Sequence, residues 1–251
     1  MAEDIILSTE GLAKSFRGVA AVDGVDLNVR RGSIHALIGP NGAGKTTCFN
    51  LLTKMVRPSR GTIRFKDRDI TRLSPASVAR LGLGRSFQIS AVFPHLTVLE
   101  NVRVALQRRR GGSFDFWRSE ALLSSYDAEA FGLLDAVGLS SFAVHAAAEL
   151  PYGRKRALEL ATTLALDPEL MLLDEPMAGM ASEDIERVTA LIRRAARDRT
   201  VLMVEHNLSV VASLSDRITV LARGKILAEG RYDAVSKDPR VIEAYIGVGH
   251  G

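Results

Sequence analysis

The sequence has little of what distinguishes secreted, membrane-spanning or disordered chains. Its one cysteine, Cys48, excludes a disulfide framework and suits a reducing compartment. No apolar run approaches the roughly 20 residues that a membrane-spanning helix needs, and the acidic residues ahead of the first apolar run argue against a secretory signal. Lys and Arg number 33 against 29 Asp and Glu, a surplus too small to identify a nucleic acid or a membrane surface as the partner.

What remains is the composition of a globular protein. Hydrophobic residues make up 47% and charged residues 25% of the 251 residues, and these values exclude a disordered or collagen-like chain. The length allows one to two domains with a substantial core. No internal repeat or low-complexity linker divides the chain.

Apolar patterning predicts an α/β fold with a helical middle. Short apolar and β-branched runs predict strands at 5–8, 25–29, 34–38, 62–65, 170–173, 201–204, 218–221 and 226–228. Helical spacing and capping residues predict helices at 45–55, from Ser74, from Thr97, and at 127–137, 152–166, 182–197 and 239–245. This order favours a discontinuous core, about 1–87 and 166–251, with a helical insertion at about 88–165.

The sharpest motif is a glycine-rich segment between a predicted strand and a predicted helix. Glycines there let successive backbone N–H groups face phosphate oxygens, and the helix N-terminus adds its positive dipole end. Lys45 would reach the β- and γ-phosphates of a nucleotide, and the Thr46 hydroxyl would bind Mg²⁺. Cys48, just beyond, is expected to be a buried packing residue. The segment, which fits G-x-x-x-x-G-K-[ST], is Gly39-Pro40-Asn41-Gly42-Ala43-Gly44-Lys45-Thr46-Thr47.

A second motif supplies two carboxylates. The apolar run 170–173 ends in Asp174 and Glu175. We expect Asp174 to hold Mg²⁺, directly or through water, and Glu175 to polarise the water that attacks the γ-phosphate. A GTPase is disfavoured because no N-K-x-D motif occurs, and a small-molecule kinase would not need a glutamate beside the Mg²⁺ aspartate.

The segment before the helix predicted at 152–166 carries a family resemblance. Leu150-Pro151-Tyr152-Gly153-Arg154 resembles the signature L-S-G-G-Q of ATP-binding cassette (ABC) transporters, in the form L-[SP]-Y-G-Q of branched-chain amino acid importers. The resemblance to an ABC nucleotide-binding subunit extends over essentially the whole chain, and it implies that Pro151, Tyr152 and Gly153 meet the nucleotide held by a partner subunit. Pro151 in place of serine removes a hydroxyl and an N–H, and Arg154 replaces the glutamine.

The resemblance also implies the fold and several residue roles. The fold is a P-loop NTPase (RecA-like) core with an N-terminal antiparallel β-subdomain and an inserted α-helical subdomain, in a single ABC ATPase domain over 1–251. Ala181 stands where the family has Asp or Asn, which predicts weaker or asymmetric communication between two nucleotide sites. The implied roles are Gln88 near Mg²⁺ and the attacking water, His206 at the γ-phosphate, Phe16 stacked on adenine, and Val22 against the base or ribose.

The chain ending resembles one kind of ABC subunit in particular. The ending 228–247, which includes Asp238-Pro239 and Glu243-Ala244-Tyr245, is similar to the larger ATPase subunit of high-affinity branched-chain amino acid importers, as is the stretch 92–102. That resemblance implies uptake of branched-chain amino acids or related amino acids and amides. Two alternatives stay open: the ATPase of a lipid or lipopolysaccharide exporter, and an ABC protein without a transport role.

The resemblance implies ATP and Mg²⁺ as cofactors and a set of protein partners. These are a second ABC ATPase subunit in a head-to-tail homo- or heterodimer, transmembrane permease subunits and, indirectly, a substrate-binding protein, but no nucleic acid. The chain would lie at the cytoplasmic face of the inner membrane as a peripheral subunit. Val92, Phe93 and Leu96 are the candidates for permease contacts, and the basic stretch 108–117 would be a solvated loop or lie near headgroups or the permease.

Overall fold

The computed structural model describes residues 4–85, 92–109 and 125–246. The chain divides into two compact units. The sheet unit comprises Met1–Leu83, Glu169–Asp174 and Ala196–Gly251, and the helical unit comprises Gly84–Pro168 and Glu175–Ala195. The helical unit therefore takes in residues 175–195, which lie outside the insertion expected at about 88–165.

The strands form two sheets of different character. In the first, neighbouring strands run antiparallel in the order β2-β1-β5-β6, and β3 also pairs with β1. The bounds are β1 (Ile5–Phe16), β2 (Val19–Val25), β3 (Asn28–Arg30), β5 (Arg60–Phe65) and β6 (Arg68–Asp69). This sheet agrees with the antiparallel β-subdomain that the family resemblance implies.

The second sheet has the order β11-β10-β4-β9-β8-β7. Its inner strands β10, β4, β9 and β8 are parallel, and β11 returns antiparallel along β10. Every residue of β4, β8 and β9 is buried, as continuous apolar runs predict for parallel strands covered on both faces. The bounds are β4 (Ile34–Ile38), β7 (Leu83–Arg85), β8 (Leu170–Asp174), β9 (Thr200–Val204), β10 (Arg217–Ala222) and β11 (Lys225–Gly230).

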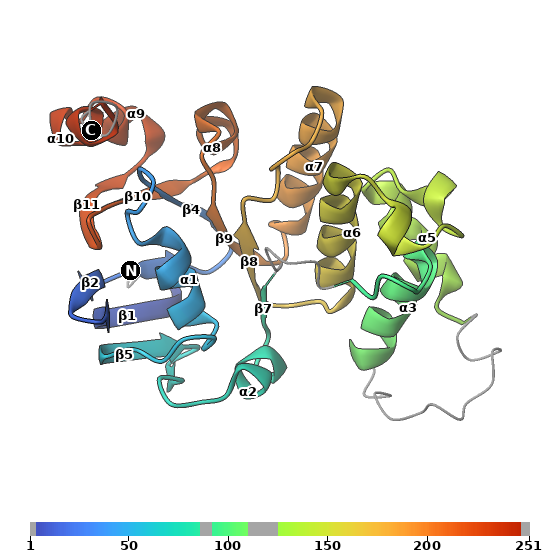
Figure 1. The fold of residues 1–251 in the computed structure, drawn as a ribbon, viewed down its shortest axis with the longest axis horizontal. Helices are drawn as coiled ribbons and strands as arrows, with labels where there is room; N and C mark the ends of the chain where they lie inside the picture. Colours follow the sequence, from blue (N-terminus) through green and yellow to red (C-terminus); the bar gives the residue numbers. More distant parts are fainter. Residues whose placement is uncertain (1–3, 86–91, 110–124, 247–251) are drawn as a thin grey trace. The chain divides into compact units, whose positions relative to one another are not determined.

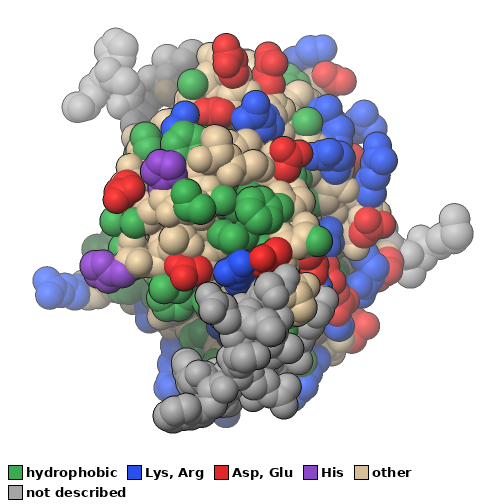
Figure 2. Space-filling view, turned by 90° about the vertical axis from the view of Figure 1, so that its right-hand side faces the viewer, with side chains coloured by type: hydrophobic (Ala, Val, Ile, Leu, Met, Phe, Trp, Pro, Cys, Tyr) green, Lys and Arg blue, Asp and Glu red, His purple; other side chains and the backbone are tan. Residues whose placement is uncertain are grey.

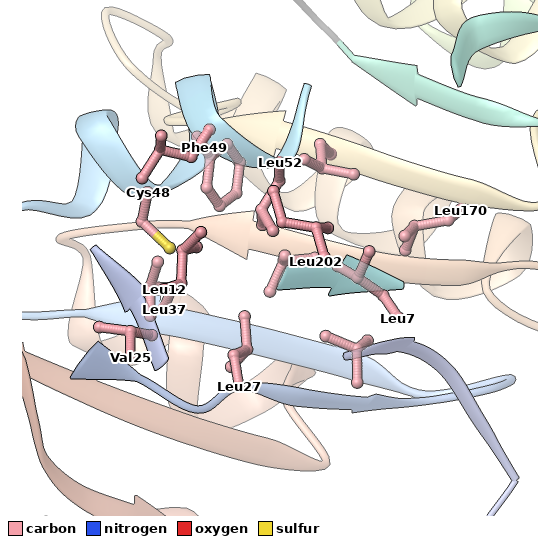
Figure 3. Close-up of a cluster of buried hydrophobic side chains, with 14 of the residues drawn as sticks. Leu7, Leu12, Val25, Leu27, Leu37, Cys48, Phe49, Leu52, Leu170 and Leu202 are labelled. Atoms are coloured by element: carbon pink, nitrogen blue, oxygen red, sulfur yellow. The ribbon is translucent and has the colours of Figure 1, made fainter. Parts of the chain in front are cut away.

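Helix α1 (Lys45–Leu52) lies between the two sheets of this unit and joins them in one core (Figure 1). Cys48, Phe49 and Leu52 have no exposed surface and belong to the same cluster as Leu7 of β1 and Leu202 of β9 (Figure 3). Burial raises the pKa of the Cys48 thiol to about 12, so this cysteine is an inert packing residue, as expected. The core fixes the start of α1, where the phosphate loop ends.

The remaining helices of the sheet unit are short. Ser74 caps α2 by accepting a hydrogen bond from the Ser77 backbone N–H, with Pro75 in the first turn, as the sequence predicts. Asn207 caps α8 in the same way, accepting from Ser209 and Val210. The bounds are α2 (Pro75–Arg80), α8 (Leu208–Leu214), α9 (Tyr232–Val235) and α10 (Pro239–Ile246).

The helical unit is built from α3 (Val98–Arg109), α5 (Asp127–Ala136), α6 (Tyr152–Ala165) and α7 (Ser182–Ala195). The first three pack on one another. The capping box expected at Thr97 is present, because the Glu100 backbone N–H donates to the Thr97 hydroxyl oxygen and the Thr97 N–H donates to the Glu100 carboxylate. No helix in the described parts of the chain is long and apolar enough to cross a membrane.

The prediction of one continuous strand at 25–29 is wrong. β2 ends at Val25 and β3 begins at Asn28, because side chains take over the hydrogen bonds between them. The Asp26 carboxylate accepts from the Gly11 backbone N–H at 2.5 Å, and the Thr9 hydroxyl oxygen accepts from the Leu27 N–H at 2.9 Å. The sequence patterns also miss α8 and α9, which are too short to show a helical period.

A row of hydrogen-bonded polar side chains runs from β4 through β10 to β11. His35 is fully buried, and its Nε2 lies 2.8 Å from the Thr219 hydroxyl oxygen, which in turn donates to Glu229 at 2.9 Å. Because the Thr219 hydrogen points to Glu229, the Thr219 oxygen accepts from His35, so the proton of the neutral imidazole sits on Nε2. Burial lowers the pKa of His35 to about 4.

The low pKa of His35 predicts loss of stability in mild acid. The unfolded chain takes up a proton near the ordinary histidine pKa of 6.5 and the folded chain only near 4, so stability falls as the pH drops through this range. The full difference corresponds to about 3 kcal/mol. Urea unfolding at several pH values should show a steeper loss in the wild type than in His35→Gln. Parallel pH profiles would contradict the assignment.

Candidate functional site

Three glycines give the phosphate loop its path between β4 and α1. Gly39, Gly42 and Gly44 have positive φ angles of 148°, 77° and 101°, a backbone region that residues with a side chain rarely adopt. A Cβ on Gly39 would overlap the carbonyl oxygen of Leu221 in β10. The loop is thus pressed against the sheet at its first residue, and its glycines are structurally required.

In the described part of the chain, no side chain caps the N-terminus of α1. Gly44 is the N-cap residue and makes no side-chain hydrogen bond, and no acidic residue lies in the first turn. The first backbone N–H groups of a helix have no partner within the helix, and together with the helix dipole they favour an anion. Pro40 and Gly44 lie half-buried, whereas Asn41, Gly42 and Thr46 are exposed, so this end of α1 is open to a ligand.

Lys45 reaches back over the loop. Its Nζ donates to the carbonyl oxygen of Gly39 at 2.6 Å and to that of Pro40 at 2.9 Å. A phosphate oxygen is a stronger acceptor for an ammonium group than a neutral carbonyl. Lys45 is therefore held at the loop by bonds that a bound phosphate can replace.

The parallel sheet brings the acidic motif to the same edge as this loop. Within the sheet unit, Asp174 ends β8 in register with Val204 of β9, and Val204 is in register with Leu37 of β4. Ligands of open α/β sheets bind at the carboxyl ends of the parallel strands, and the phosphate loop, Asp174 and the turn after β9 all lie there. Asp174 is 1% exposed.

Glu175 follows Asp174 directly and has an unusual backbone. Its φ is 49°, the left-handed conformation that costs a residue with a side chain roughly 1–2 kcal/mol. Such conformations cluster where function requires an exact side-chain direction. The left-handed backbone at Glu175 thus marks the point where β8 ends, directly after Asp174.

The turn after β9 presents His206. Its side chain is exposed, and its backbone N–H donates at 3.0 Å to the carboxylate of Glu205, which also accepts from Asn207. Glu205 is 1% exposed. The sequence motifs do not include this glutamate, although an acid immediately before His206 is the signal that could have found it: it fixes the backbone that carries the histidine.

The oxygen donors at this edge suit Mg²⁺. The hydroxyl of Thr46 and the carboxylate of Asp174 are hard ligands, and Mg²⁺ usually takes one or two protein oxygens and completes its shell with water and substrate phosphates. Within the described ranges no group of three or more His, Cys, Asp or Glu residues could hold a metal by itself. Gln88 lies outside the described residues.

The two residues expected at the nucleotide base, Phe16 and Val22, differ in their exposure. Phe16 is 48% exposed at the end of β1, with the Lys14 Nζ 5.2 Å from its ring centroid, so its ring is available for stacking. Val22 is a correction, because it has no exposed surface and packs within the hydrophobic core. In β2 the buried residues are Val22 and Val25, so Val22 faces the core of the sheet unit.

The signature segment opens α6 in the helical unit. Pro151 is the N-cap residue and makes no side-chain hydrogen bond, and the first turn holds no acidic residue. Tyr152 is 57% exposed, whereas a Cβ on Gly153 would lie 2.7 Å from the Gly179 carbonyl oxygen. A glycine is therefore needed at 153, because the first turn of α6 lies close to the loop that follows Glu175.

The basic residues after Gly153 are engaged inside the helical unit. The Arg154 guanidinium carbon lies 3.9 Å from the Phe142 ring centroid, a cation–π contact. Arg156 donates to Glu159 at 2.8 Å in a buried ion pair and to the Tyr152 hydroxyl at 3.0 Å. Arg154, which replaces the family glutamine, thus anchors the segment against a neighbouring turn.

The structure adds a residue behind the candidate permease contacts. Asn101 is 3% exposed, accepts from the Phe93 N–H at 2.6 Å and donates to the Phe93 and Thr97 carbonyl oxygens. Phe93 is 53% exposed and Leu96 half-buried, but Val92 is only 6% exposed and thus packs inward rather than facing a partner. Figure 2 shows hydrophobic side chains gathered among charged ones on one face of the molecule.

Family models match most of the chain. The ABC transporter model matches residues 22–178, and the model described as branched-chain amino acid ATP-binding cassette transporter matches residues 225–251. The chain is 38% identical to the high-affinity branched-chain amino acid transport ATP-binding protein BraF of Pseudomonas aeruginosa, over 96% of this chain and 98% of that protein. It is 37% identical to LivG of Escherichia coli, a protein of the same description, with the same coverage.

Solved structures agree with the sequence comparisons. A nucleotide-free ATP-binding cassette from an ABC transporter is 31% identical, with a TM-score of 0.83 over 97% of this chain and 99% of that one. An ABC transporter cassette in its ADP conformation is also 31% identical, with a TM-score of 0.80 over 98% of this chain and 100% of that one. These matches confirm the P-loop NTPase fold, and the chain belongs to the ATP-binding cassette ATPases of ABC transporters, in the branched-chain amino acid group.

Proposed function

We propose that this chain is an ATP-hydrolysing subunit of an importer for branched-chain amino acids or related amino acids and amides. The observation that carries the proposal is the uncapped, glycine-rich entry to α1 at the same sheet edge as Asp174. The relatives named for branched-chain amino acid transport, and the matching C-terminal segment, support the substrate class. Because selectivity resides in other subunits, the chain itself supplies the ATPase.

In the proposed reaction the phosphate loop binds the nucleotide. The backbone N–H groups of the first turn of α1 and the ammonium of Lys45 hold the β- and γ-phosphates, and the ring of Phe16 stacks on adenine. Mg²⁺, held by Thr46 and Asp174, would offset phosphate charge. Glu175 accepts a proton from the attacking water, His206 donates a hydrogen bond to the γ-phosphate, and Gln88 is assigned to the same region.

Two such ATPases would work head to tail, beneath a permease. Each nucleotide would lie between the phosphate loop of one subunit and the segment Pro151, Tyr152 and Gly153 of the other. Closure can be driven only by nucleotide contacts made in the closed pair and not in the open one. Hydrolysis removes these contacts, the pair reopens, and the permease, with its substrate-binding protein, returns to its starting state. The pair would sit peripherally at the cytoplasmic side of the inner membrane.

The experiment is purification of the chain with the products of neighbouring genes, followed by measurement of phosphate release. We expect a permease and a second ATPase to copurify and ATP turnover to respond to binding protein loaded with leucine. Copurification with an exporter, or turnover that ignores the loaded binding protein, would contradict the proposed substrate class.

The exposed ring of Phe93 provides a sharper test of permease coupling. Phe93→Asp places an anion on an apolar contact, and we expect about tenfold less transport while ATP hydrolysis by the isolated chain is unchanged, because contact residues in well-packed interfaces contribute about 1–2 kcal/mol or more. Val144→Asp is the matched control, since Val144 is 79% exposed in the same unit. Equal transport by both variants would exclude Phe93 from the permease contact.

A further inference from the structure

The start of α6 lies directly on the loop 176–181, within the helical unit. A Cβ on Gly179 would lie 2.5 Å from Cδ1 and 2.9 Å from Cε1 of Tyr152, so the Tyr152 ring covers the α-carbon of this glycine. A Cβ on Gly153 would in turn lie 2.7 Å from the Gly179 carbonyl oxygen. Gly179 has a φ of 73°, which residues with a side chain rarely adopt. The signature segment and this loop therefore touch through two glycines and one ring.

The same loop starts at the residue assigned as the base. The Ala178 N–H donates to the Glu175 carbonyl oxygen at 3.1 Å, and the Met180 N–H donates to the Met177 carbonyl oxygen at 3.2 Å. Two consecutive turns thus connect Glu175 with Gly179, and Met177 between them is buried. Because packed and hydrogen-bonded segments transmit displacements, a shift of the loop at Gly179 moves the backbone at Glu175.

The Tyr152 ring is held by a side chain one turn further along α6. The Arg156 guanidinium donates to the Tyr152 hydroxyl at 3.0 Å, and its carbon lies 5.3 Å from the ring centroid. Another nitrogen of the same guanidinium donates to Glu159 at 2.8 Å, and the side chains of Arg156 and Glu159 are 6% and 4% exposed. Such an ion pair keeps one geometry, because burial makes its separation costly. It therefore fixes the ring on Gly179.

We propose that Arg156 is a positioning residue that couples the signature segment to the turn at Glu175. The coupling passes from Arg156 to the Tyr152 ring, and from that ring to the backbone of Gly179. The proposal rests on the proposed function, in which the signature segment meets the nucleotide of the partner subunit while Glu175 acts on the nucleotide of its own subunit. A nucleotide at one site thereby adjusts the base at the other.

The physical reason is that the chemical step depends on where the base stands. Tyr152 is 57% exposed, so a nucleotide of the partner subunit meets one side of a ring whose hydroxyl Arg156 holds. A loose ring would absorb this contact, whereas a fixed ring passes it to the loop. Misplacing a catalytic group slows the chemical step, so the effect should fall on kcat. This route runs through the backbone and does not need the polar side chain that Ala181 lacks.

The test is Arg156→Lys in the assembled transporter. Lysine keeps the charge beside Glu159 but lacks the planar fork with which arginine binds two partners at once. We expect kcat for ATP hydrolysis to fall about three- to tenfold, the effect of one lost hydrogen bond, while the Kd of the purified chain for MgATP stays within about twofold of wild type. Hydrogen exchange of the Ala178 amide should become faster, while that of the Ala130 amide, bonded to Tyr126 in α5, should not change.

Tyr152→Phe removes the other half of the same bond and keeps both the ring and the buried ion pair. If the bond carries the coupling, this variant lowers kcat as much as Arg156→Lys does, and the double variant loses no more than either single one. Arg103→Lys is the matched control, because it makes the same exchange in an ion pair with Asp127, 2.6 Å away, that joins α3 to α5. It should keep the wild-type kcat.

Three results would overturn the proposal. Ala178 exchange in Arg156→Lys at the wild-type rate would mean that Arg156 does not hold the loop. Faster exchange with the wild-type kcat would mean that the loop does not position the base. Losses of kcat that multiply in the double variant would mean that Arg156 and Tyr152 act independently. If the wild-type transporter itself hydrolyses no ATP, the proposed function fails, whereas the exchange measurement still decides whether Arg156 holds the loop.

Discussion

Glu175→Gln is expected to lower ATP hydrolysis by about 10²- to 10⁴-fold while leaving MgATP binding intact, because a positioned general base contributes a factor of this size. Glutamine has nearly the same shape but cannot accept the proton of the attacking water. The nucleotide would then persist in the closed pair, so the variant should accumulate as an ATP-dependent dimer. Phosphate release and size-exclusion chromatography with and without ATP measure the two effects.

The backbone of Glu175 makes a control necessary. Its φ of 49° is strained for any residue with a side chain, and Glu175→Gln retains that strain, so the Tm should stay close to wild type. Glu183→Gln, at an exposed position in the first turn of α7, should hydrolyse ATP normally. Wild-type turnover by Glu175→Gln in the intact complex would show that another group is the base.

Lys45→Ala is expected to reduce kcat/KM for ATP by about a thousandfold or more. Hydrogen bonds to charged groups contribute about 1.5–3 kcal/mol to binding, and removing a preorganised donor from a site of developing charge costs a further factor of about 10²–10³. The carbonyl oxygens of Gly39 and Pro40 now accept from Lys45 and would lose this donor in the variant. Calorimetry should show at least about tenfold weaker MgATP binding.

Lys225→Ala is the matched control for Lys45→Ala. Lys225 also lines a hollow beside the loop, but its ammonium pairs with Asp23 at 3.3 Å and is well exposed. We expect its removal to change nucleotide affinity little, because exposed ion pairs contribute about 0–1 kcal/mol. If both variants bound MgATP like the wild type, the phosphate-binding role of Lys45 would be wrong.

The local parts of the fold and site were predictable because their signals are local. The run 34–38 and the motif after it identify a buried strand, a glycine loop and a helix start, and the structure has β4 and α1 at those places. The same holds for the caps at Ser74 and Thr97, where a side chain bonds a backbone N–H three residues away. Such features depend on neighbouring residues only.

The residues that the sequence did not reveal act on parts of the backbone that no local pattern connects to them. Asn101 is important through the backbone of Phe93, whose N–H and carbonyl oxygen it binds from eight residues away. Val22 is a different case. The family resemblance placed it near the nucleotide base, but in the folded sheet its side chain faces the core. Which face a strand residue takes depends on register, and register is set by pairing with distant strands.

The most direct test of the central claim measures phosphate release and leucine uptake together in vesicles that contain the assembled transporter. We expect ATP supplied to the side of this subunit to drive both, and Glu175→Gln to abolish both while radiolabelled ATP stays bound. Leucine uptake at the wild-type rate by the Glu175→Gln complex would contradict the claim that ATP hydrolysis by this chain powers import.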